Sequence, residues 1–202
     1  MPRVLTQSDV ADFRERLSEA ATRMFATRGP EAFTMRELAS ELGVSAMTPY
    51  RYFRDKDEIL AAVRARAFSR FAEALEQAIA TPGNGLEKSA AVYAAYVAFA
   101  FAEPAAYRLM FDLSQPNEEA YPELVEASRR ARATMTAYLR VLVQEGVLEG
   151  DPDLMGYVFW SALHGAVVLQ LAGKLDPKYD FRTITGEAFR ALSQSYLPKP
   201  QQ

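Results

Sequence analysis

Residues 34–56 read TMRELASELGVSAMTPYRYFRDK, and this stretch decides how the N-terminal part of the chain folds. Thr34 and Glu37 stand at the spacing of a capping box, in which each side chain satisfies the backbone N–H of the other residue at a helix start. An apolar face follows along the helix, and Gly43 can take the positive φ that ends many helices. The stretch therefore predicts a short helix that stops in a tight turn.

A second short helix is predicted directly after the turn, because Ser45 is a favourable N-cap. Pro49 would then be the fourth helical residue, so its missing N–H removes one hydrogen bond and adds some crowding at the helix start. The residue before a proline resists helical geometry, so we expect Thr48 to tilt or loosen the first turn. We therefore expect a second helix whose first turn is slightly destabilised by Pro49.

Apolar residues recur with a period near 3.6 along the rest of the chain, and period-2 alternation is scarce, which predicts an all-α fold of about nine helices. Gly29-Pro30 ends the first helix, and TPGNG at 81–85 is the clearest break. The predicted helices are two short ones within 33–53 and longer ones near 8–28, 56–80, 86–102, 105–113, 123–145, 153–172 and 183–196.

The composition argues against several kinds of site. There is no cysteine and a single histidine, His164, which excludes a disulfide framework and leaves little basis for a zinc site or a Ser-His triad. The sequence shows no nucleophile–base pair, no Gly-rich phosphate loop and no metal-ligand spacing. We therefore expect no metal, no cofactor and no enzymatic activity.

The charge balance permits a nucleic-acid surface at the N-terminal end without requiring one. The whole chain carries a net charge of -3, whereas residues 1–66 hold eleven Lys and Arg against ten Asp and Glu. We see no apolar run long enough to span a bilayer, and the N-terminus lacks the apolar stretch of a signal peptide. We expect a soluble cytoplasmic protein that does not act at a membrane.

Two short helices joined by a one-glycine turn form the helix-turn-helix pattern, although an ordinary corner between packed helices has the same spacing. Ala46, Met47 and Thr48 are small or flexible, so they permit a close approach to base edges. The following side chains offer hydroxyl groups and cations suited to phosphates. They are Tyr50, Tyr52, Arg54 and Lys56.

Specific positions here match a known family. The matching motifs are Thr34-x-Arg36-Glu37-Leu38-Ala39, Gly43-Val44-Ser45, Tyr50-Arg51-Tyr52-Phe53 and Lys56-x-Glu58-x-Leu60. They resemble, over about residues 13–60, the DNA-binding domain of the TetR/AcrR family of bacterial transcription regulators. The resemblance implies an all-helical homodimer, with a three-helix helix-turn-helix DNA-binding domain over residues 1–56 and a larger ligand-binding and dimerisation domain over residues 57–202.

The resemblance also assigns DNA contacts by position. Thr34 can contact a phosphate or serve only as a cap, Arg36 can reach DNA or be a solvated charge, and Tyr52 can contact DNA or pack against the first helix. The family usually carries leucine at the position of Pro49, whereas Phe53 is assigned to the core. The expected DNA-binding residues are Thr34, Arg36, Ser45, Ala46, Met47, Thr48, Tyr50, Tyr52 and Lys56.

Aromatic residues at helical spacing are frequent in the C-terminal part, and such stripes form either a core or the wall of a ligand pocket. Trp160 and His164 share a helix face, and Gly165 lets another backbone approach closely. They resemble a Trp-x-x-x-His-Gly (WHG) motif of one TetR subgroup, in which His164 would lie in a core, a dimer interface or a ligand site. The expected effector-binding residues are Tyr93, Tyr96, Tyr107, Phe111, Tyr138, Trp160 and His164.

The resemblance places a dimer interface in the last two helices, whose apolar stripes suit a four-helix bundle between subunits. It implies a ligand-responsive repressor that binds a palindromic DNA operator as a homodimer, with a small apolar or aromatic effector. The alternative is a helical small-molecule-binding or scaffold protein whose helix-turn-helix is only a packing corner. The expected interface residues are Leu154, Val158, Ser161, Val168, Leu171, Phe189, Leu192 and Tyr196.

Overall fold

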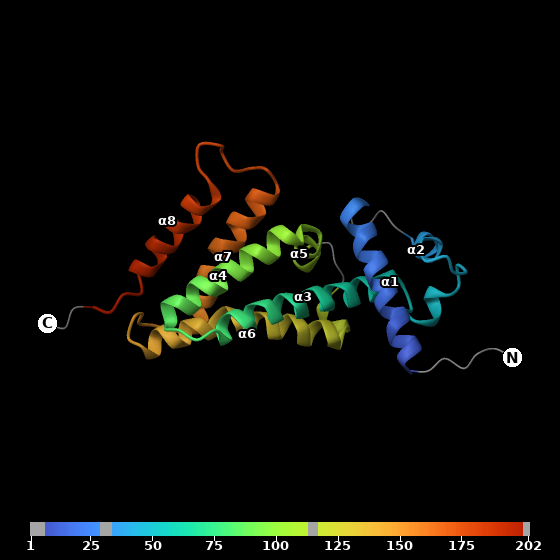
Figure 1. The fold of residues 1–202 in the computed structure, drawn as a ribbon, viewed down its shortest axis with the longest axis horizontal. Helices are drawn as coiled ribbons and strands as arrows, with labels where there is room; N and C mark the ends of the chain where they lie inside the picture. The colour runs from blue at the N-terminus through green and yellow to red at the C-terminus, as the bar shows by residue number, and fades with distance from the viewer. Residues whose placement is uncertain (1–6, 29–33, 113–116, 200–202) are drawn as a thin grey trace. The chain divides into compact units, whose positions relative to one another are not determined.

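The computed structural model describes residues 7–28, 34–112 and 117–199, and within these ranges the chain is all-α, as predicted (Figure 1). The expected end of the first helix at Gly29-Pro30 lies outside the described residues. The helices are α1 (Gln7–Arg28), α2 (Met35–Glu41), α3 (Lys56–Ala80), α4 (Gly85–Ala102), α5 (Pro104–Met110), α6 (Pro122–Gln144), α7 (Pro152–Leu171) and α8 (Phe181–Gln194), with 3-10 helices η2 (Pro49–Arg51) and η3 (Glu118–Ala120).

The chain forms two compact units, neither of them a continuous stretch of sequence. The N-terminal unit combines residues 1–69 with 105–128, and the C-terminal unit combines 70–104 with 129–202. Both α3 and α6 contribute residues to each unit. The domain boundary at residues 56 and 57 remains a prediction, since these units follow packing and not chain order.

The N-terminal unit is built around a core shared by α1, α2 and the first turns of α3. Arg66 of α3 forms ion pairs with Glu15 and Glu19 of α1, at 2.8 and 3.2 Å, on the outside of this core. Such partly exposed pairs add little stability, so burial of the apolar faces holds the unit together. The buried core residues are Leu17, Ala20, Ala21, Met24, Phe25, Met35, Leu38, Phe53, Ile59, Leu60, Val63 and Leu109.

A buried polar network lies in the same unit. The guanidinium of Arg64 on α3 donates to Glu118 Oε1 at 2.8 Å and to the Met110 carbonyl at 3.3 Å, while the Ser128 hydroxyl donates to Glu118 Oε2 at 3.0 Å. Burial lowers the pKa of Arg64, and Glu118 opposes that shift. Removing one partner of such a pair leaves a buried charge, so the network fixes η3 against α3.

The C-terminal unit packs the second half of α3 with α4, α6, α7 and α8. The Phe71 ring of α3 meets Tyr96 and Phe99 of α4 edge to face, each with ring centroids 5.1 Å apart. Arg130 of α6 holds Glu76 of α3 through a pair of hydrogen bonds at 2.7 and 2.5 Å. Aromatic packing therefore forms the interior of this unit, and an arginine fork joins two of its helices.

One glycine sets how closely α6 and α7 cross. A Cβ atom added to Gly156 of α7 would lie 2.6 Å from Thr136 Cγ2 and 3.2 Å from the Met135 carbonyl oxygen of α6. Backbone cannot yield as a flexible side chain does, so the crossing requires glycine here. By contrast, Gly165 has no atom of the described chain within 4 Å of such a Cβ, so the close approach expected there does not occur within one subunit.

The expectation that no apolar run could span a bilayer needs correction. Among the described residues, α7 is long and apolar enough by length and composition, and α4 with α5 would qualify as a bent pair. One third of the α7 window is buried inside the structure, and core helices of soluble proteins meet the same criterion. The apolar length of α7 is therefore weak support for a membrane span.

We expect Gly156→Ala to lower the free energy of unfolding by about 1–3 kcal/mol, because the methyl group forces α6 and α7 apart. Gly186→Ala on α8 is the matched control, since its Cβ would meet no atom within 4 Å. Alanine in an open helical position stabilises by up to about 1 kcal/mol. Urea unfolding followed by circular dichroism measures both, and equal stabilities of the two variants would contradict the steric explanation.

Candidate DNA interface and effector cavity

The start of α2 has the predicted capping box. The Thr34 N–H donates to Glu37 Oε2 at 2.8 Å, and the Glu37 N–H donates to Thr34 Oγ1 at 3.2 Å. Both side chains are exposed, as is Arg36 between them. The helix ends at Leu42, and Gly43 has φ of 66°, as the sequence indicated. The cap orders Thr34 and leaves Arg36 directed away from the core.

The second helix of the motif differs from the prediction. Residues 45–48 form turns, and η2 is a 3-10 helix of three residues that begins at Pro49. Ser45 does not cap through a backbone N–H, because its hydroxyl lies 2.9 Å from Thr48 Oγ1. The Thr48 N–H donates to the Ser45 carbonyl at 2.9 Å, which closes a tight turn in place of a helical one.

The proline accounts for this difference. An α-helix capped by Ser45 would place the first i→i−4 hydrogen bond at residue 49, and proline has no N–H to donate. The chain instead closes i→i−3 bonds, from Arg51 to Thr48 and from Tyr52 to Pro49, at 3.1 and 3.0 Å. Thr48 takes helical angles of φ −62° and ψ −46°, so the expected resistance of a residue before proline is overcome here.

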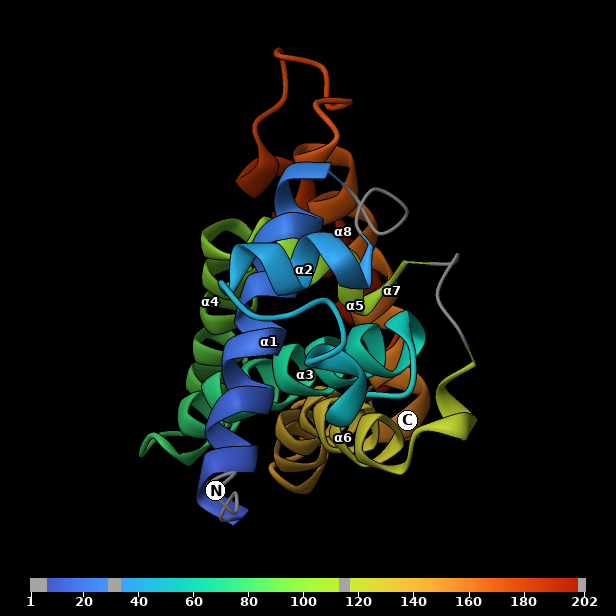
Figure 2. The ribbon, with the colours of Figure 1, turned by 90° about the vertical axis from the view of Figure 1, so that its right-hand side faces the viewer.

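Side chains of α1 hold the far end of the segment in place. Figure 2 shows the course of the backbone through α1, α2 and this segment. The Arg14 guanidinium donates to the Tyr52 carbonyl at 2.9 Å and lies 4.3 Å from the centre of the Phe53 ring. The Phe13 and Tyr52 rings lie 4.5 Å apart. Tyr52 thus packs against the first helix, which was one of its two expected roles, and Phe53 is buried in the core as predicted.

The segment presents several side chains to solvent while its proline is buried. Met47 is 69% exposed and Tyr50 is 48% exposed, and Ser45 and Ala46 are exposed as well. A single exposed apolar side chain is common on protein surfaces, so Met47 matters here for its position after the turn and not for its exposure alone. Thr48, Tyr52 and Lys56 are half-buried.

The start of α3 is capped close to this face. Asp55 Oδ1 accepts from the Glu58 N–H at 2.8 Å, and Glu58 Oε2 accepts from the Arg54 N–H at 2.7 Å and from Arg54 Nε at 3.1 Å. The hydrogen bond to Glu58 raises the pKa of Arg54, whose side chain stays exposed. Arg54 is therefore a cation held near the exposed segment.

The C-terminal unit contains a small, partly open cavity of about 20 Å³ between α4, α6, α7 and α8. Four of the predicted effector residues line it, namely Tyr93, Tyr96, Tyr138 and Trp160. That volume holds about one water molecule, so a ligand can enter only if side chains move. The other lining residues are Ser89, Val92, Met135, Gly156, Phe159, Leu163 and Phe189.

Hydroxyl groups of the tyrosines face different partners. The Trp160 indole donates to the Tyr96 hydroxyl at 3.0 Å, and the Tyr93 hydroxyl lies 2.8 Å from Thr185 Oγ1 of α8. Tyr138 is only 9% exposed, and its hydroxyl has no hydrogen-bond partner within the described part of the chain. Burial raises the pKa of Tyr138 to about 12, so the group stays protonated and offers a donor.

The remaining predicted effector residues do not line this cavity. Tyr107 and Phe111 lie in the N-terminal unit, where their rings are 5.1 Å apart and Phe111 also packs on Phe68. His164 is half-buried on α7, with its ring 5.9 Å from that of Trp160. Burial lowers the pKa of His164. Their role in binding an effector stays a prediction.

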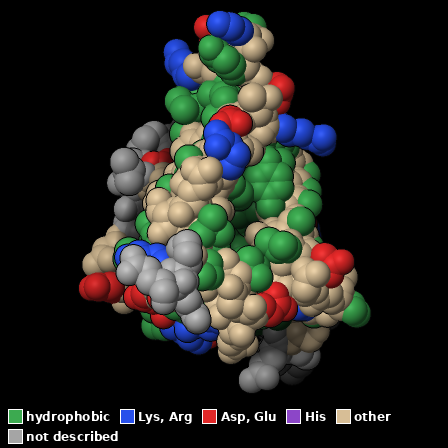
Figure 3. Space-filling view, turned by 90° about the vertical axis from the view of Figure 1, so that its left-hand side faces the viewer, with side chains coloured by type: hydrophobic (Ala, Val, Ile, Leu, Met, Phe, Trp, Pro, Cys, Tyr) green, Lys and Arg blue, Asp and Glu red, His purple; other side chains and the backbone are tan. Residues whose placement is uncertain are grey.

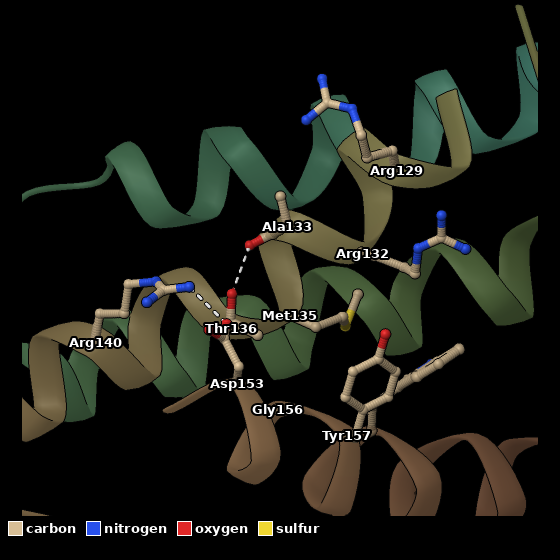
Figure 4. A pocket seen from close by; sticks show the side chains of 10 residues that line it. Arg129, Arg132, Ala133, Met135, Thr136, Arg140, Asp153, Gly156 and Tyr157 are labelled. Atoms are coloured by element: carbon tan, nitrogen blue, oxygen red, sulfur yellow. Dashed lines mark hydrogen bonds and ion pairs between the residues drawn. The ribbon is translucent and has the colours of Figure 1, made fainter. Parts of the chain in front are cut away.

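A wider groove of about 330 Å³ runs between α6 and α7 (Figure 4). Its α6 wall carries Arg129, Arg132 and Arg140, none of which stood out in the sequence. Their spacing of three and eight residues could have shown that they share one helix face, together with Thr136. The α7 wall carries Asp153, Gly156, Tyr157 and Trp160.

Comparison with known proteins identifies the family. Residues 89–192, which are half of the chain, match the family described as tetracyclin repressor-like, C-terminal domain, and residues 17–63 match the bacterial regulatory proteins of the tetR family. The chain belongs to the TetR family. It is a DNA-binding transcriptional regulator, and the helix-turn-helix is more than a packing corner. The WHG subgroup remains a prediction.

Two sequence relatives of this TetR-family chain are also named as transcriptional regulators. It is 29% identical over 165 residues to an uncharacterized HTH-type transcriptional regulator of Mycobacterium tuberculosis, covering 81% of this chain and 72% of that one. It is 32% identical over 134 residues to the HTH-type transcriptional regulator BetI of Rhizobium meliloti, covering 64% and 65%. A solved structure of a protein of unknown function from Rhodococcus sp. RHA1 has a TM-score of 0.80 at 25% identity, covering 98% and 100%. The Mycobacterium and Rhizobium relatives are named as transcriptional regulators and not as enzymes.

The described residues hold no cluster of three or more side chains that could bind a metal ion.

We expect Pro49→Ala to extend an α-helix over residues 46–52, because it restores the N–H that can donate to the Ser45 carbonyl. Backbone chemical shifts of these residues measure the change. Pro152→Ala is the matched control, since Pro152 opens α7, where the first N–H has no helical partner. Unchanged shifts at 46–52 in Pro49→Ala would show that the turn has another cause.

His164, the single histidine of the chain, should titrate below its ordinary pKa of 6.5, because burial disfavours the imidazolium. The Cε1–H resonance of its ring follows the titration by NMR. The unfolded chain binds this proton more readily, so the contribution to stability is complete above pH 6.5 and is lost as the pH falls toward the folded pKa. A folded-state pKa at or above 6.5 contradicts the burial.

Proposed function

We propose that this regulator is a cytoplasmic, ligand-responsive repressor that binds a palindromic operator as a homodimer. The observation that supports the DNA contacts best is the exposed Met47, on the turn that follows α2 within the region matching the tetR family. TetR-family regulators bind DNA, dimerise and bind small-molecule effectors. Repression is the usual mode of the family, and this chain is proposed to share it.

The proposed DNA contacts form two groups. Thr34 and Arg36 stand at the exposed start of α2 and are proposed to meet phosphates or a base edge. Met47 and Tyr50 are the most exposed side chains of the segment that follows the turn. Because that segment is a turn with a 3-10 helix, its side chains fan out differently from those of a recognition helix. The other proposed contacts are Ser45, Ala46, Thr48, Tyr52 and Lys56.

The proposed dimer surface lies on α7 and α8. Leu154 is 56% exposed and Val168 is 44% exposed on α7, and Ser161 is exposed between them. Figure 3, which views the end of the molecule that carries α8, shows hydrophobic side chains gathered in a hollow with charged side chains around it. Exposed apolar faces of this kind suit a four-helix bundle between two subunits. The other proposed interface residues are Val158, Leu171, Phe189, Leu192 and Tyr196.

The proposed effector site is the aromatic cavity, and its small volume suggests how a ligand would act. A ligand that enlarges the cavity by displacing Trp160 or Met135 would move α7 against α6 or break the Trp160–Tyr96 hydrogen bond. Such a ligand shifts operator affinity only if it binds the two conformations differently. The proposed effector is small and apolar or aromatic in its larger part.

We expect purified dimer to bind DNA beside its own coding region with strong salt dependence, because phosphate contacts release counterions. Lys56→Ala should weaken binding to all sequences and reduce the salt slope by about 1, whereas Met47→Ala should change the preference at one base position by about 1–3 kcal/mol. Arg182→Ala, at an exposed residue of α8, is the control and should change neither.

Fluorescence anisotropy with a labelled duplex at several salt concentrations measures these effects. If Lys56→Ala and Arg182→Ala lower the DNA affinity equally, Lys56 does not make the proposed phosphate contact. A wild-type dimer without salt-sensitive binding to that DNA would contradict the proposed operator.

A further inference from the structure

The charge of the groove between α6 and α7 is unusual for this chain. Three arginines line it against one aspartate, although the chain as a whole carries a net charge of -3. Arg140 is already neutralised by Asp153, with 2.6 Å between Nη2 and Oδ1. Arg132 is exposed and has no ion pair or hydrogen bond to any residue that the structure describes. The groove therefore offers a guanidinium, and guanidinium groups bind carboxylates and phosphates through paired hydrogen bonds.

The groove and the aromatic cavity share a wall. Met135, Gly156 and Trp160 line both spaces. Gly156 has no side chain, so Met135 and Trp160 are the two side chains that line both the charged groove and the apolar cavity. Methionine is unbranched and adapts its shape easily, and the Trp160 indole is held by one hydrogen bond to Tyr96. The two side chains that line both spaces can therefore move without unfolding a helix.

The groove is lined by charged side chains and the cavity by apolar ones, and this difference defines one kind of ligand. In Figure 4 Arg132 of α6 lies nearest to Tyr157 of α7, with Met135 beside them, whereas Arg140 lies at the other end of the groove next to Asp153. Beyond Met135 and Trp160 the cavity wall is aromatic and aliphatic, with the Tyr138 hydroxyl as an unpaired donor. A molecule that satisfies both spaces needs an acidic group at one end and an apolar body at the other.

We propose that the effector is an amphipathic organic anion, whose acidic group lies in the groove at Arg132 and whose apolar part passes Met135 and Trp160 into the aromatic cavity. This inference rests on the proposed function, because it names the ligand class of the proposed effector site. The acidic group is a carboxylate or a phosphate, since a guanidinium binds both.

Trp160 is the only tryptophan of the chain, so its fluorescence reports this site alone. The full-length protein is titrated with decanoate, decyl phosphate, decanol and acetate, each below its aggregation concentration, and calorimetry provides a second readout. At least one of the two long-chain anions should bind about tenfold or more tightly than decanol, because a charge-assisted hydrogen bond adds to the same apolar contact. Acetate should bind weakly, and the preferred head group distinguishes carboxylate from phosphate ligands.

Arg132→Gln separates the charge from the apolar contact. It should weaken binding of the preferred anion about tenfold and leave the affinity for decanol unchanged, because only the anion uses the guanidinium. Lys174→Gln removes the same charge from an exposed position outside the groove and should change neither affinity. The inference is overturned if decanol binds as tightly as both anions, or if Arg132→Gln leaves the anion affinity unchanged.

Sedimentation velocity of Arg132→Gln adds a further distinction. Loss of the dimer together with unchanged affinity for the anion would overturn the inference and mark the groove as a subunit contact. DNA binding of the ligand-free wild type is measured separately. A protein that binds its operator but no long-chain anion refutes this inference alone, whereas one that binds the anion but no DNA refutes the proposed operator and leaves the ligand site standing.

Discussion

The N-terminal unit depends on the burial of one aromatic ring, that of Phe53. The ring is 2% exposed among core residues of α1, α2 and α3, and the Arg14 guanidinium covers it at 4.3 Å. Phe53 directly follows the exposed segment, so burying it fixes where that segment ends. A cation over a ring is worth about 0.5–2 kcal/mol, and the hydrogen bond from Arg14 to the Tyr52 carbonyl adds direction. The position of the segment therefore does not depend on whether it forms an α-helix.

Local rules of the sequence predicted most of the fold, because they act between neighbours in the chain. The Thr34–Glu37 cap, the positive φ of Gly43 and the burial of Phe53 all follow from residue type and spacing, and the structure contains each of them. The consequence of Pro49 was underestimated. Its missing N–H was expected to cost one bond at the edge of a helix, but no α-helix forms over a stretch so short that one bond decides between α and 3-10 geometry.

The proposed effector site was less predictable, because its parts come together only in the tertiary structure. Trp160 and Tyr96 are 64 residues apart and share one hydrogen bond, which helical spacing does not reveal. Tyr107 and Phe111 have the same residue types as the cavity wall, yet they lie in the other unit. The sequence did not single out Arg132, because its place in the groove depends on how α6 packs beside α7.

The exposed turn after α2 has a consequence for how this protein can change over generations. Ala46 and Met47 support no core and no cap, and the backbone around them is set by Pro49 and by the burial of Phe53. Substitutions at these two positions are therefore almost free of any penalty in stability. With the proposed DNA contacts at Ala46 and Met47, a lineage carrying this proline would change its target sequence by single substitutions that the fold tolerates.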